Sequence, residues 1–94
     1  MFVLIAYDVS TIDRAGARRL RRVAQACEDY GQRVQKSVFE CKVDRKTWVQ
    51  FRARLLREID DAQDSLRIYF LERDTPTQHY GVREPLDLEE PLVF

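Results

Sequence analysis

The chain has 94 residues, of which 45% are hydrophobic and 34% charged, with only three Gly and three Pro. This length holds one domain, and the composition excludes a disordered tail, a collagen-like fibre and a disulfide scaffold. No apolar run approaches the roughly 20 residues of a membrane helix, and the start Phe2–Tyr7 lacks the basic flank of a signal peptide. Cys27 and Cys41 have no metal-type spacing and suit a reduced compartment. We therefore expect a small, soluble, cytoplasmic protein that has no membrane partner.

The charges are segregated along the chain, although the formal net charge is zero. Residues 1–57 carry 13 of the 16 basic and six of the 16 acidic residues, a net charge of +7, and residues 58–94 carry −7. Thirteen of the bases are Arg, whose planar fork suits phosphate. This pattern predicts a face that binds a polyanion and a separate region that binds protein. The alternative is two solvated surfaces.

The first half of the chain predicts a strand, a helix and an extended stretch. Residues 2–9 are a nearly continuous apolar run, as in a strand buried on both faces. Residues 14–30 follow the helical period, and Gly31 stops the helix. Residues 33–43 are extended, either as one bent strand or as a hairpin that turns near Lys36-Ser37. The residues typical of a helix start are Ser10, Thr11 and Asp13.

The second half predicts a capped helix, a strand and an irregular tail. Asp44 caps the helix. Its apolar face is formed by Trp48, Phe51, Leu55, Leu56 and Ile59, and its water-facing side by Lys46, Gln50, Arg54 and Arg57. Residues 60–64 form a polar turn and residues 65–71 a strand. Beyond Asp74, prolines punctuate two short extended pieces, around Gln78–Val82 and Leu92–Phe94.

Two helices separated and flanked by strands indicate a small α+β sandwich. With a hairpin after the first helix, the order is βαββαβ, the ferredoxin-like arrangement, with a core at residues 1–74 and a tail at residues 75–94. Both helices then cover one face of the sheet and leave the other bare. We expect a homodimer whose sheets pack face to face, with the apolar end Leu92, Val93 and Phe94 pairing with the partner subunit. The alternative is a tail that folds back on its own subunit.

Four stretches carry a resemblance to a known family. They are Tyr7-Asp8-Val9-Ser10, the arginine-rich run 18–24, the block 30–41 with Arg-Val-Gln-Lys-Ser-Val-Phe-Glu at its centre, and Asp64-Ser65-Leu66-Arg67-Ile68-Tyr69. Together they resemble the Cas2 family of CRISPR-associated proteins, the small subunit of spacer acquisition, over nearly the whole chain. The end of the chain, from Gly81-Val82 to Pro91-Leu92, is similar to a subset of the family with a short acidic tail.

The resemblance implies a ferredoxin-like homodimer in which the last strand joins the sheet of the partner. It also implies that this dimer acts with the Cas1 integrase and bridges two integrase dimers across a duplex of foreign DNA. Many family members are described as metal-dependent endonucleases on RNA or duplex DNA. They use the aspartate after the first-strand tyrosine, which is Asp8 in this sequence.

Asp8 is the candidate catalytic and metal-binding residue. Phosphodiester cleavage needs an activated water and neutralised phosphate oxygens, and a Mg²⁺ ion on one or two carboxylates supplies both. A two-fold axis near Asp8 would bring its second copy. The alternative is a turn or cap role for Asp8. The expected supporting residues are Tyr7, Ser10, Ser37 and Phe39, of which Ser10 would orient a water or phosphate and the aromatic rings either stack, line the dimer face or belong to the core.

An exposed arc of arginines on the first helix is the candidate nucleic-acid surface. Its members are Arg14, Arg18, Arg21 and Arg22, with Arg33 as a further candidate near the next strand. Such residues hold a phosphate backbone without reading its sequence, and the alternative is a solvated helix face. Arg19 lies nearer the core edge and suits an ion pair equally well. Trp48 is expected in the core, both cysteines as buried thiols, and His79 in the loose tail rather than as a general base.

Three hypotheses remain for the function: a Mg²⁺-dependent nuclease, an architectural subunit that clamps duplex DNA and docks an integrase through its acidic segment, and a ligand-sensing module. The arginine arc argues against the third. One carboxylate per chain, with no Lys or Glu beside it in sequence, is a thin catalytic set, which favours the second hypothesis slightly. We therefore expect a spacer-acquisition subunit, with nuclease activity as a possibility that the family resemblance implies.

Overall fold

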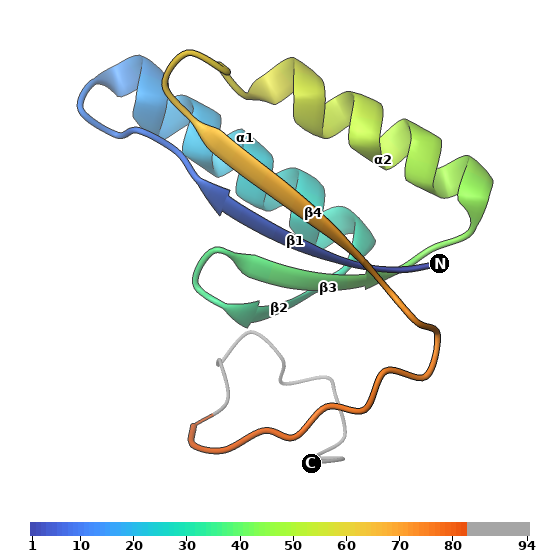
Figure 1. Ribbon diagram of the computed structural model, residues 1–94. Coiled ribbons are helices and arrows are strands. Elements are labelled where there is room, and N and C mark those ends of the chain that lie inside the picture. The colour runs from blue at the N-terminus through green and yellow to red at the C-terminus, as the bar shows by residue number, and fades with distance from the viewer. Residues whose placement is uncertain (83–94) are drawn as a thin grey trace.

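Six elements follow one another in the order βαββαβ in the computed structural model, which describes residues 1–82 (Figure 1). They are β1 (Phe2–Asp8), α1 (Arg14–Tyr30), β2 (Gln32–Gln35), β3 (Val38–Lys42), α2 (Arg45–Glu58) and β4 (Ser65–Leu71). The strands form one antiparallel sheet in the order β2-β3-β1-β4. This is the ferredoxin-like α+β fold that the sequence predicts.

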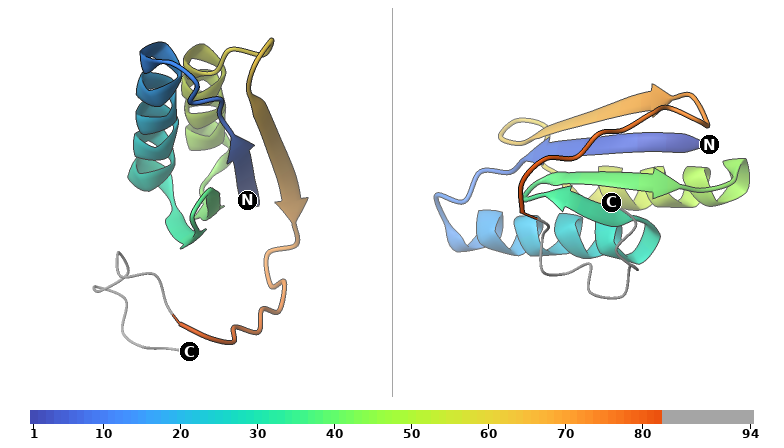
Figure 2. Two further views of the ribbon diagram at one scale, coloured as in Figure 1. Left: turned by 90° about the vertical axis from the view of Figure 1, so that its left-hand side faces the viewer. Right: turned by 90° about the horizontal axis from the view of Figure 1, so that it is seen from below.

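Both helices lie on the same side of the sheet (Figure 2). Side chains alternate between the two faces of a strand, and the central strand β1 sends Val3, Ile5 and Tyr7 toward the helices, where each is at most 6% exposed. Leu4, Ala6 and Asp8 therefore lie on the opposite face, which no helix covers and which we call the uncovered face. Tyr69 of β4 is opposite Leu4 in the sheet register and belongs to the same face.

The core lies between the sheet and the two helices. Ile5 and Phe39 of the sheet, and Val23, Phe51 and Leu55 of the helices, have no exposed surface. Burial of one such side chain contributes roughly 1.5–3 kcal/mol to the free energy of unfolding. As predicted, Trp48 is a core residue, and Cys27 and Cys41 are buried free thiols.

Two aspartates cap the helices. The Asp13 carboxylate accepts a hydrogen bond from the Gly16 amide at 2.8 Å, and the Asp44 carboxylate accepts one from the Thr47 amide at 2.7 Å. A capping bond of this kind contributes about 1 kcal/mol. The prediction of Asp44 as a cap is confirmed, and of the three helix-start residues before α1 it is Asp13 that caps.

Residues 33–43, for which the sequence allowed either one bent strand or a hairpin, belong to a hairpin. β2 and β3 pair across a turn at Lys36-Ser37, and the register shifts between Arg33 and Gln35. This irregularity is a β-bulge or a related distortion, and it increases the local twist of the pair. The hairpin turn therefore lies at the end of the sheet where β1 finishes.

Three expectations for the second half of the chain are wrong. Leu56 is 54% exposed, because it lies on the flank of α2 away from the buried stripe of Trp48 and Leu55. Arg54 does not face water alone, since its guanidinium pairs with Asp29 of α1 at 2.7 Å. The described part of the tail, up to residue 82, forms no strand around Gln78–Val82, and the predicted strand at Leu92–Phe94 lies outside the described residues.

Candidate functional site

Asp8 is the last residue of β1, on the uncovered face, with its side chain exposed to solvent. Within residues 1–82 its carboxylate has no hydrogen bond or ion pair, whereas Asp13 performs the capping role that was the alternative for Asp8. A carboxylate without a local partner is available to a cation or to a proton donor. The geometry thus leaves Asp8 open for chemistry.

The backbone on both sides of Asp8 is fixed. The Tyr7 amide donates to the Ser37 carbonyl at 3.1 Å, and the Ser10 amide donates to the Asp64 carboxylate at 3.0 Å. The hairpin turn and the β1–α1 loop therefore meet at the end of β1, where the backbones of Ser37 and Ser10 lie close to Asp8 in these contacts.

Lys36 is a residue of this region that the sequence analysis missed. It lies in the turn between β2 and β3, next to Ser37, whose carbonyl accepts from the Tyr7 amide. Lys36 is exposed. Its place at the Asp8 end of the sheet depends on the pairing of β3 with β1, so no local pattern could have revealed it.

Tyr7 and Phe39 lie on the helix side of the sheet. Tyr7 is 6% exposed and Phe39 is fully buried, and their rings stack with centroids 6.2 Å apart. Neither ring lines the uncovered face, because the strand alternation that exposes Asp8 turns Tyr7 inward. Burial raises the pKa of Tyr7 to about 12, so its phenol stays protonated at neutral pH.

The arginine arc of α1 is exposed along its length: Arg14, Arg18, Arg21 and Arg22. Of these four, only Arg22 has an ion pair to a described residue, a loose 3.9 Å contact with Glu58. The arc begins six residues after Asp8, at the same end of the sheet. It is available to an external polyanion.

Helix stability does not explain this arc. α1 has no acidic residue in its first turn and no basic residue in its last turn. Cations at a helix N-terminus oppose the helix dipole, at a cost of roughly 0.3–1 kcal/mol each, and like charges four residues apart, such as Arg18 and Arg22, repel. Residues that weaken their own helix are candidates for function.

Arg33 and Arg19 have partners within the protein. The Arg33 guanidinium donates to Glu28 at 3.0 Å and to the Lys36 carbonyl at 2.8 Å, and it lies 4.9 Å from the centre of the Phe39 ring. Its side chain is 18% exposed, so Arg33 does not extend the arc. Arg19 makes the ion pair anticipated for it, with Asp64 at 2.8 Å.

One chain alone supplies a single candidate metal ligand at this site. Residues 1–82 contain no group of three or more His, Cys, Asp or Glu side chains that could hold a metal ion. Mg²⁺ commonly keeps several waters and binds one or two carboxylates. One Asp8 carboxylate is the minimum that Mg²⁺ accepts, and a second copy of Asp8 from another chain would make a two-carboxylate site.

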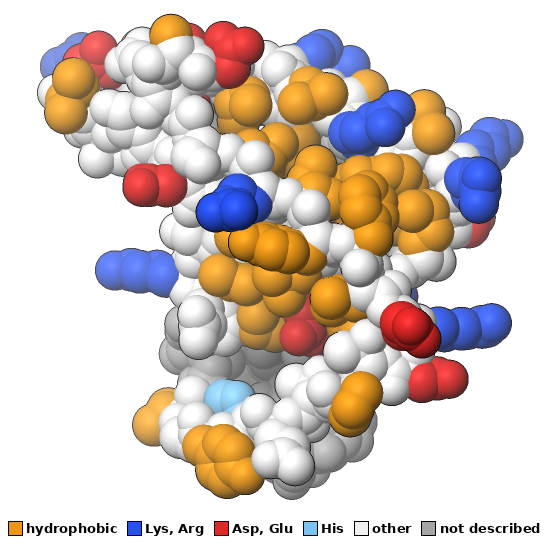
Figure 3. All heavy atoms as spheres, in the orientation of Figure 1, with side chains coloured by type: hydrophobic (Ala, Val, Ile, Leu, Met, Phe, Trp, Pro, Cys, Tyr) orange, Lys and Arg blue, Asp and Glu red, His pale blue; other side chains and the backbone are white. Residues whose placement is uncertain are grey.

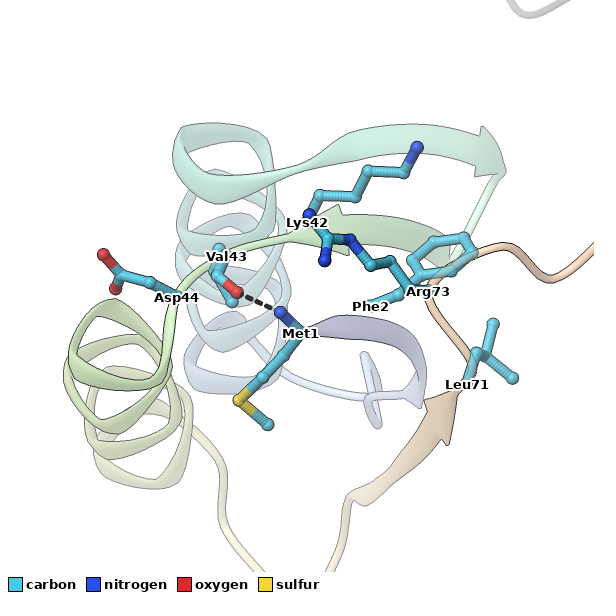
Figure 4. A pocket seen from close by; sticks show the side chains of 7 residues that line it. All are labelled: Met1, Phe2, Lys42, Val43, Asp44, Leu71 and Arg73. Atoms are coloured by element: carbon cyan, nitrogen blue, oxygen red, sulfur yellow. Dashed lines mark hydrogen bonds between the residues drawn. The ribbon is translucent and has the colours of Figure 1, made fainter.

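A hollow of about 450 Å³ lies at the other end of the sheet, where β1 begins and β4 finishes (Figure 4). Its lining residues are Met1, Phe2, Lys42, Val43, Asp44, Leu71 and Arg73. The amino group of Met1 donates to the Val43 carbonyl at 2.6 Å across one side of it. The hollow shares no residue with the Asp8 end of the sheet. No helix within the described range is long and apolar enough to cross a membrane.

The fold and this site define a class: a small ferredoxin-like protein with a free carboxylate at a strand end beside an arginine-rich helix. The family model for CRISPR associated protein Cas2 matches residues 1–78. The chain belongs to the Cas2 family, as its sequence motifs indicated.

Similarity to individual proteins extends over the whole chain. The CRISPR-associated endoribonuclease Cas2 of Chlorobaculum tepidum is 54% identical, and the CRISPR-associated endonuclease Cas2 of Halalkalibacterium halodurans is 50% identical, each with all of both chains covered. The crystal structure of Streptococcus pyogenes Cas2 at pH 6.5 superposes with a TM-score of 0.72 at 51% identity, over 79% of this chain and 89% of that chain. The relatives are therefore of the same size and architecture.

Proposed function

We propose that this chain is a subunit of CRISPR spacer acquisition that binds duplex DNA, bridges the Cas1 integrase as a homodimer, and cleaves phosphodiester bonds in RNA or DNA with Mg²⁺ held by Asp8. The observation that carries the proposal is the free Asp8 carboxylate on a fixed strand end beside the exposed arc of α1. The relatives that are named endoribonuclease and endonuclease support a nuclease.

The arginine arc binds the phosphate backbone. Four exposed guanidinium groups along one side of α1, from Arg14 to Arg22, suit the repeated charges of a duplex. Arg forms forked hydrogen bonds to phosphate oxygens, and contacts of this kind position a duplex without reading its bases. A subunit that accepts foreign DNA of any sequence needs this type of surface.

The uncovered face pairs two protomers. Tyr69 on this face is 43% exposed, and β4 is an edge strand of the sheet. In Figure 3 hydrophobic side chains gather across the middle of the surface that β4 presents. A bare sheet face and an open edge are unfavourable in water unless they are covered. A second copy of the chain covers both, with the ends Leu92, Val93 and Phe94 exchanged between subunits.

Face-to-face pairing would bring two Asp8 side chains toward one axis, where they would hold Mg²⁺. When bound, the ion neutralises phosphate charge and acidifies a water. In this proposal Asp8 supplies its carboxylate from the strand end, and Ser10 and Ser37 offer hydroxyls to water or phosphate. Lys36 places a positive charge at the same end of the sheet. Tyr7 is buried and protonated, so it does not act as the base.

A purely architectural subunit is the second candidate. It is favoured by the single carboxylate per chain and by the absence of a three-ligand cluster within residues 1–82. In that case Asp8 has no catalytic role, and the protein clamps DNA while its acidic half, residues 58–94, contacts the integrase.

Cleavage assays on RNA and on duplex DNA distinguish the two candidates. We expect cleavage by the wild type with Mg²⁺ but not with EDTA, over a pH series, and at least a 100-fold loss in Asp8→Asn. The matched control is Asp61→Asn, an exposed acid in the polar turn before β4, which should cleave as the wild type does. Equal cleavage by Asp8→Asn would assign the activity to a contaminant or to other residues. Binding without cleavage by either protein would favour the architectural subunit.

A further inference from the structure

Asp64 is an acidic residue whose role goes beyond that of a turn residue. Its side chain has no exposed surface. One carboxylate oxygen accepts the Ser10 amide at 3.0 Å and an Arg19 Nη at 3.2 Å. The other accepts the Arg19 Nε and the Asp60 amide, each at 2.8 Å. The carboxylate therefore uses its full hydrogen-bonding capacity inside the protein.

These bonds join three segments behind Asp8. Ser10 lies two residues after Asp8 in the β1–α1 loop, Arg19 is in α1, and Asp60 begins the polar turn that leads from α2 to β4. Asp64 itself precedes Ser65, which is the register partner of Asp8 in β4. The first turn of α1 packs on the same loop, since a side chain at Gly16 would collide with the Ser10 carbonyl. Asp64 thus holds the loop on one side of Asp8 while Ser37 holds the strand on the other.

Arg19 neutralises the buried charge of Asp64. A carboxylate without exposed surface is costly unless it is paired, and the forked contact with Arg19 pairs it through two nitrogens. The fork is the main reason that the pKa of Asp64 falls to about 2. Because all its acceptor positions are used, Asp64 is not a second metal ligand beside Asp8.

We infer that Asp64, neutralised by Arg19, is the positioning residue of the Asp8 site: it fixes the β1–α1 loop so that Asp8 presents its carboxylate from a rigid strand end. This inference rests on the proposed function of Asp8 as a cation ligand. A ligand held rigidly by residues around it binds more tightly than one on a mobile loop, because less order is lost on binding.

Two readouts on the full chain test the inference. The first is amide hydrogen exchange at Ser10, with Ile5 as the core reference. The second is the Mn²⁺ concentration that half-broadens the NMR signals of Asp8 and its neighbours. In Asp64→Asn, where an amide cannot accept all four bonds, we expect Ser10 to exchange at least tenfold faster and the half-broadening concentration to rise at least fivefold. Ile5 should change far less than Ser10.

The matched control makes the same substitution in another Arg–Asp pair. Asp29 lies near the end of α1, far from Asp8, and Asp29→Asn weakens its contact with Arg54 of α2. This variant should leave both readouts within twofold of the wild type. Arg19→Lys keeps the charge and the Asp64–Ser10 bond, so it should also stay close to the wild type. If Asp64→Asn does not fold, Arg19→Gln takes its place, with a change of at least threefold expected in Ser10 exchange.

The failure of the inference and the failure of the proposed function are distinguishable. Unchanged Ser10 exchange in Asp64→Asn, or equal effects of Asp64→Asn and Asp29→Asn, would overturn the positioning role. Absence of Mn²⁺ broadening at Asp8 in the wild type would contradict the proposed metal site, while hydrogen exchange would still decide whether Asp64 holds the loop.

Discussion

The two cysteines illustrate how burial decides the chemistry of single residues in this protein. Cys27 on α1 and Cys41 on β3 have no exposed surface, and burial raises the pKa of each thiol from 9.0 to about 12. The thiolate, rather than the thiol, is the nucleophile. Both groups are therefore unreactive in the folded chain near neutral pH.

Alkylation with iodoacetamide at pH 8 should leave the native protein unmodified and add two groups after denaturation in urea, as measured by intact mass. Since the pKa is higher in the folded state, the thiols also stabilise the fold below pH 9, and this contribution is lost as the pH rises from 9 toward 12. Rapid labelling of native protein at pH 8, without loss of circular dichroism, would contradict the buried placement.

The same burial argument separates the residues that the sequence could assign from those it could not. The arginine arc follows from a local pattern, the helical period, and Asp8 was assigned from the family resemblance at a predicted strand end. Asp64 follows from neither, because its partners Ser10 and Arg19 lie 54 and 45 positions away. Arg33 was grouped with the arc because it is basic and close in sequence, but its contact with Phe39 depends on the pairing of β2 with β3.

At the level of elements, the helices and the long strands were predictable, whereas the hairpin was predicted only as one of two alternatives. Capping aspartates and apolar periodicity define α1 and α2, and the runs of β1 and β4 are long and strongly apolar. The turn between β2 and β3 contains Lys36-Ser37, which lacks the Asn-Gly or Asp-Gly pair that marks most tight hairpins. Within residues 1–82 the only residue with positive φ is Gly81, so this turn is made without the usual glycine.

α1 is the element whose charges carry a test of DNA binding. Arg18→Glu with Arg22→Glu should weaken binding of duplex DNA at least tenfold at 100 mM salt, because two phosphate contacts become repulsive. The slope of log K against log[salt] should flatten by about 1.8, at about 0.9 per lost contact. Fluorescence anisotropy across a salt series measures both quantities.

The control for this test makes the same change in charge on α2. Arg45→Glu with Arg52→Glu replaces two arginines that are also exposed. This variant should alter the affinity for DNA only through the overall electrostatic potential of the protein, with the slope of log K against log[salt] nearly unchanged. Equal slopes in the wild type and the α1 variant would show that Arg18 and Arg22 do not contact phosphate.

The whole molecule has one sheet face covered by helices and one left without helices (Figure 2). The sequence predicts this asymmetry from the order of its elements, because both crossover connections of a βαββαβ chain place their helices on the same side. The sequence does not distinguish what covers the uncovered face, because the apolar side chains of Leu4 and Tyr69 would suit a partner subunit and the tail of their own chain equally well. Only the mass of the assembly distinguishes these cases.

Sedimentation equilibrium at micromolar concentration should give the mass of a dimer for the full chain. Tyr69→Asp places a charge on the uncovered face and should raise the dimer dissociation constant at least tenfold, whereas Val49→Asp, at a position on α2 that is 50% exposed, should not. Truncation after Asp87 removes Leu92, Val93 and Phe94 and should weaken the dimer in the same direction. The exchanged tail and the sheet face would contribute separately to the dimer. If Tyr69→Asp loses the dimer while the truncated chain still has the mass of a dimer, the face-to-face packing is supported and the exchange of tails is refuted.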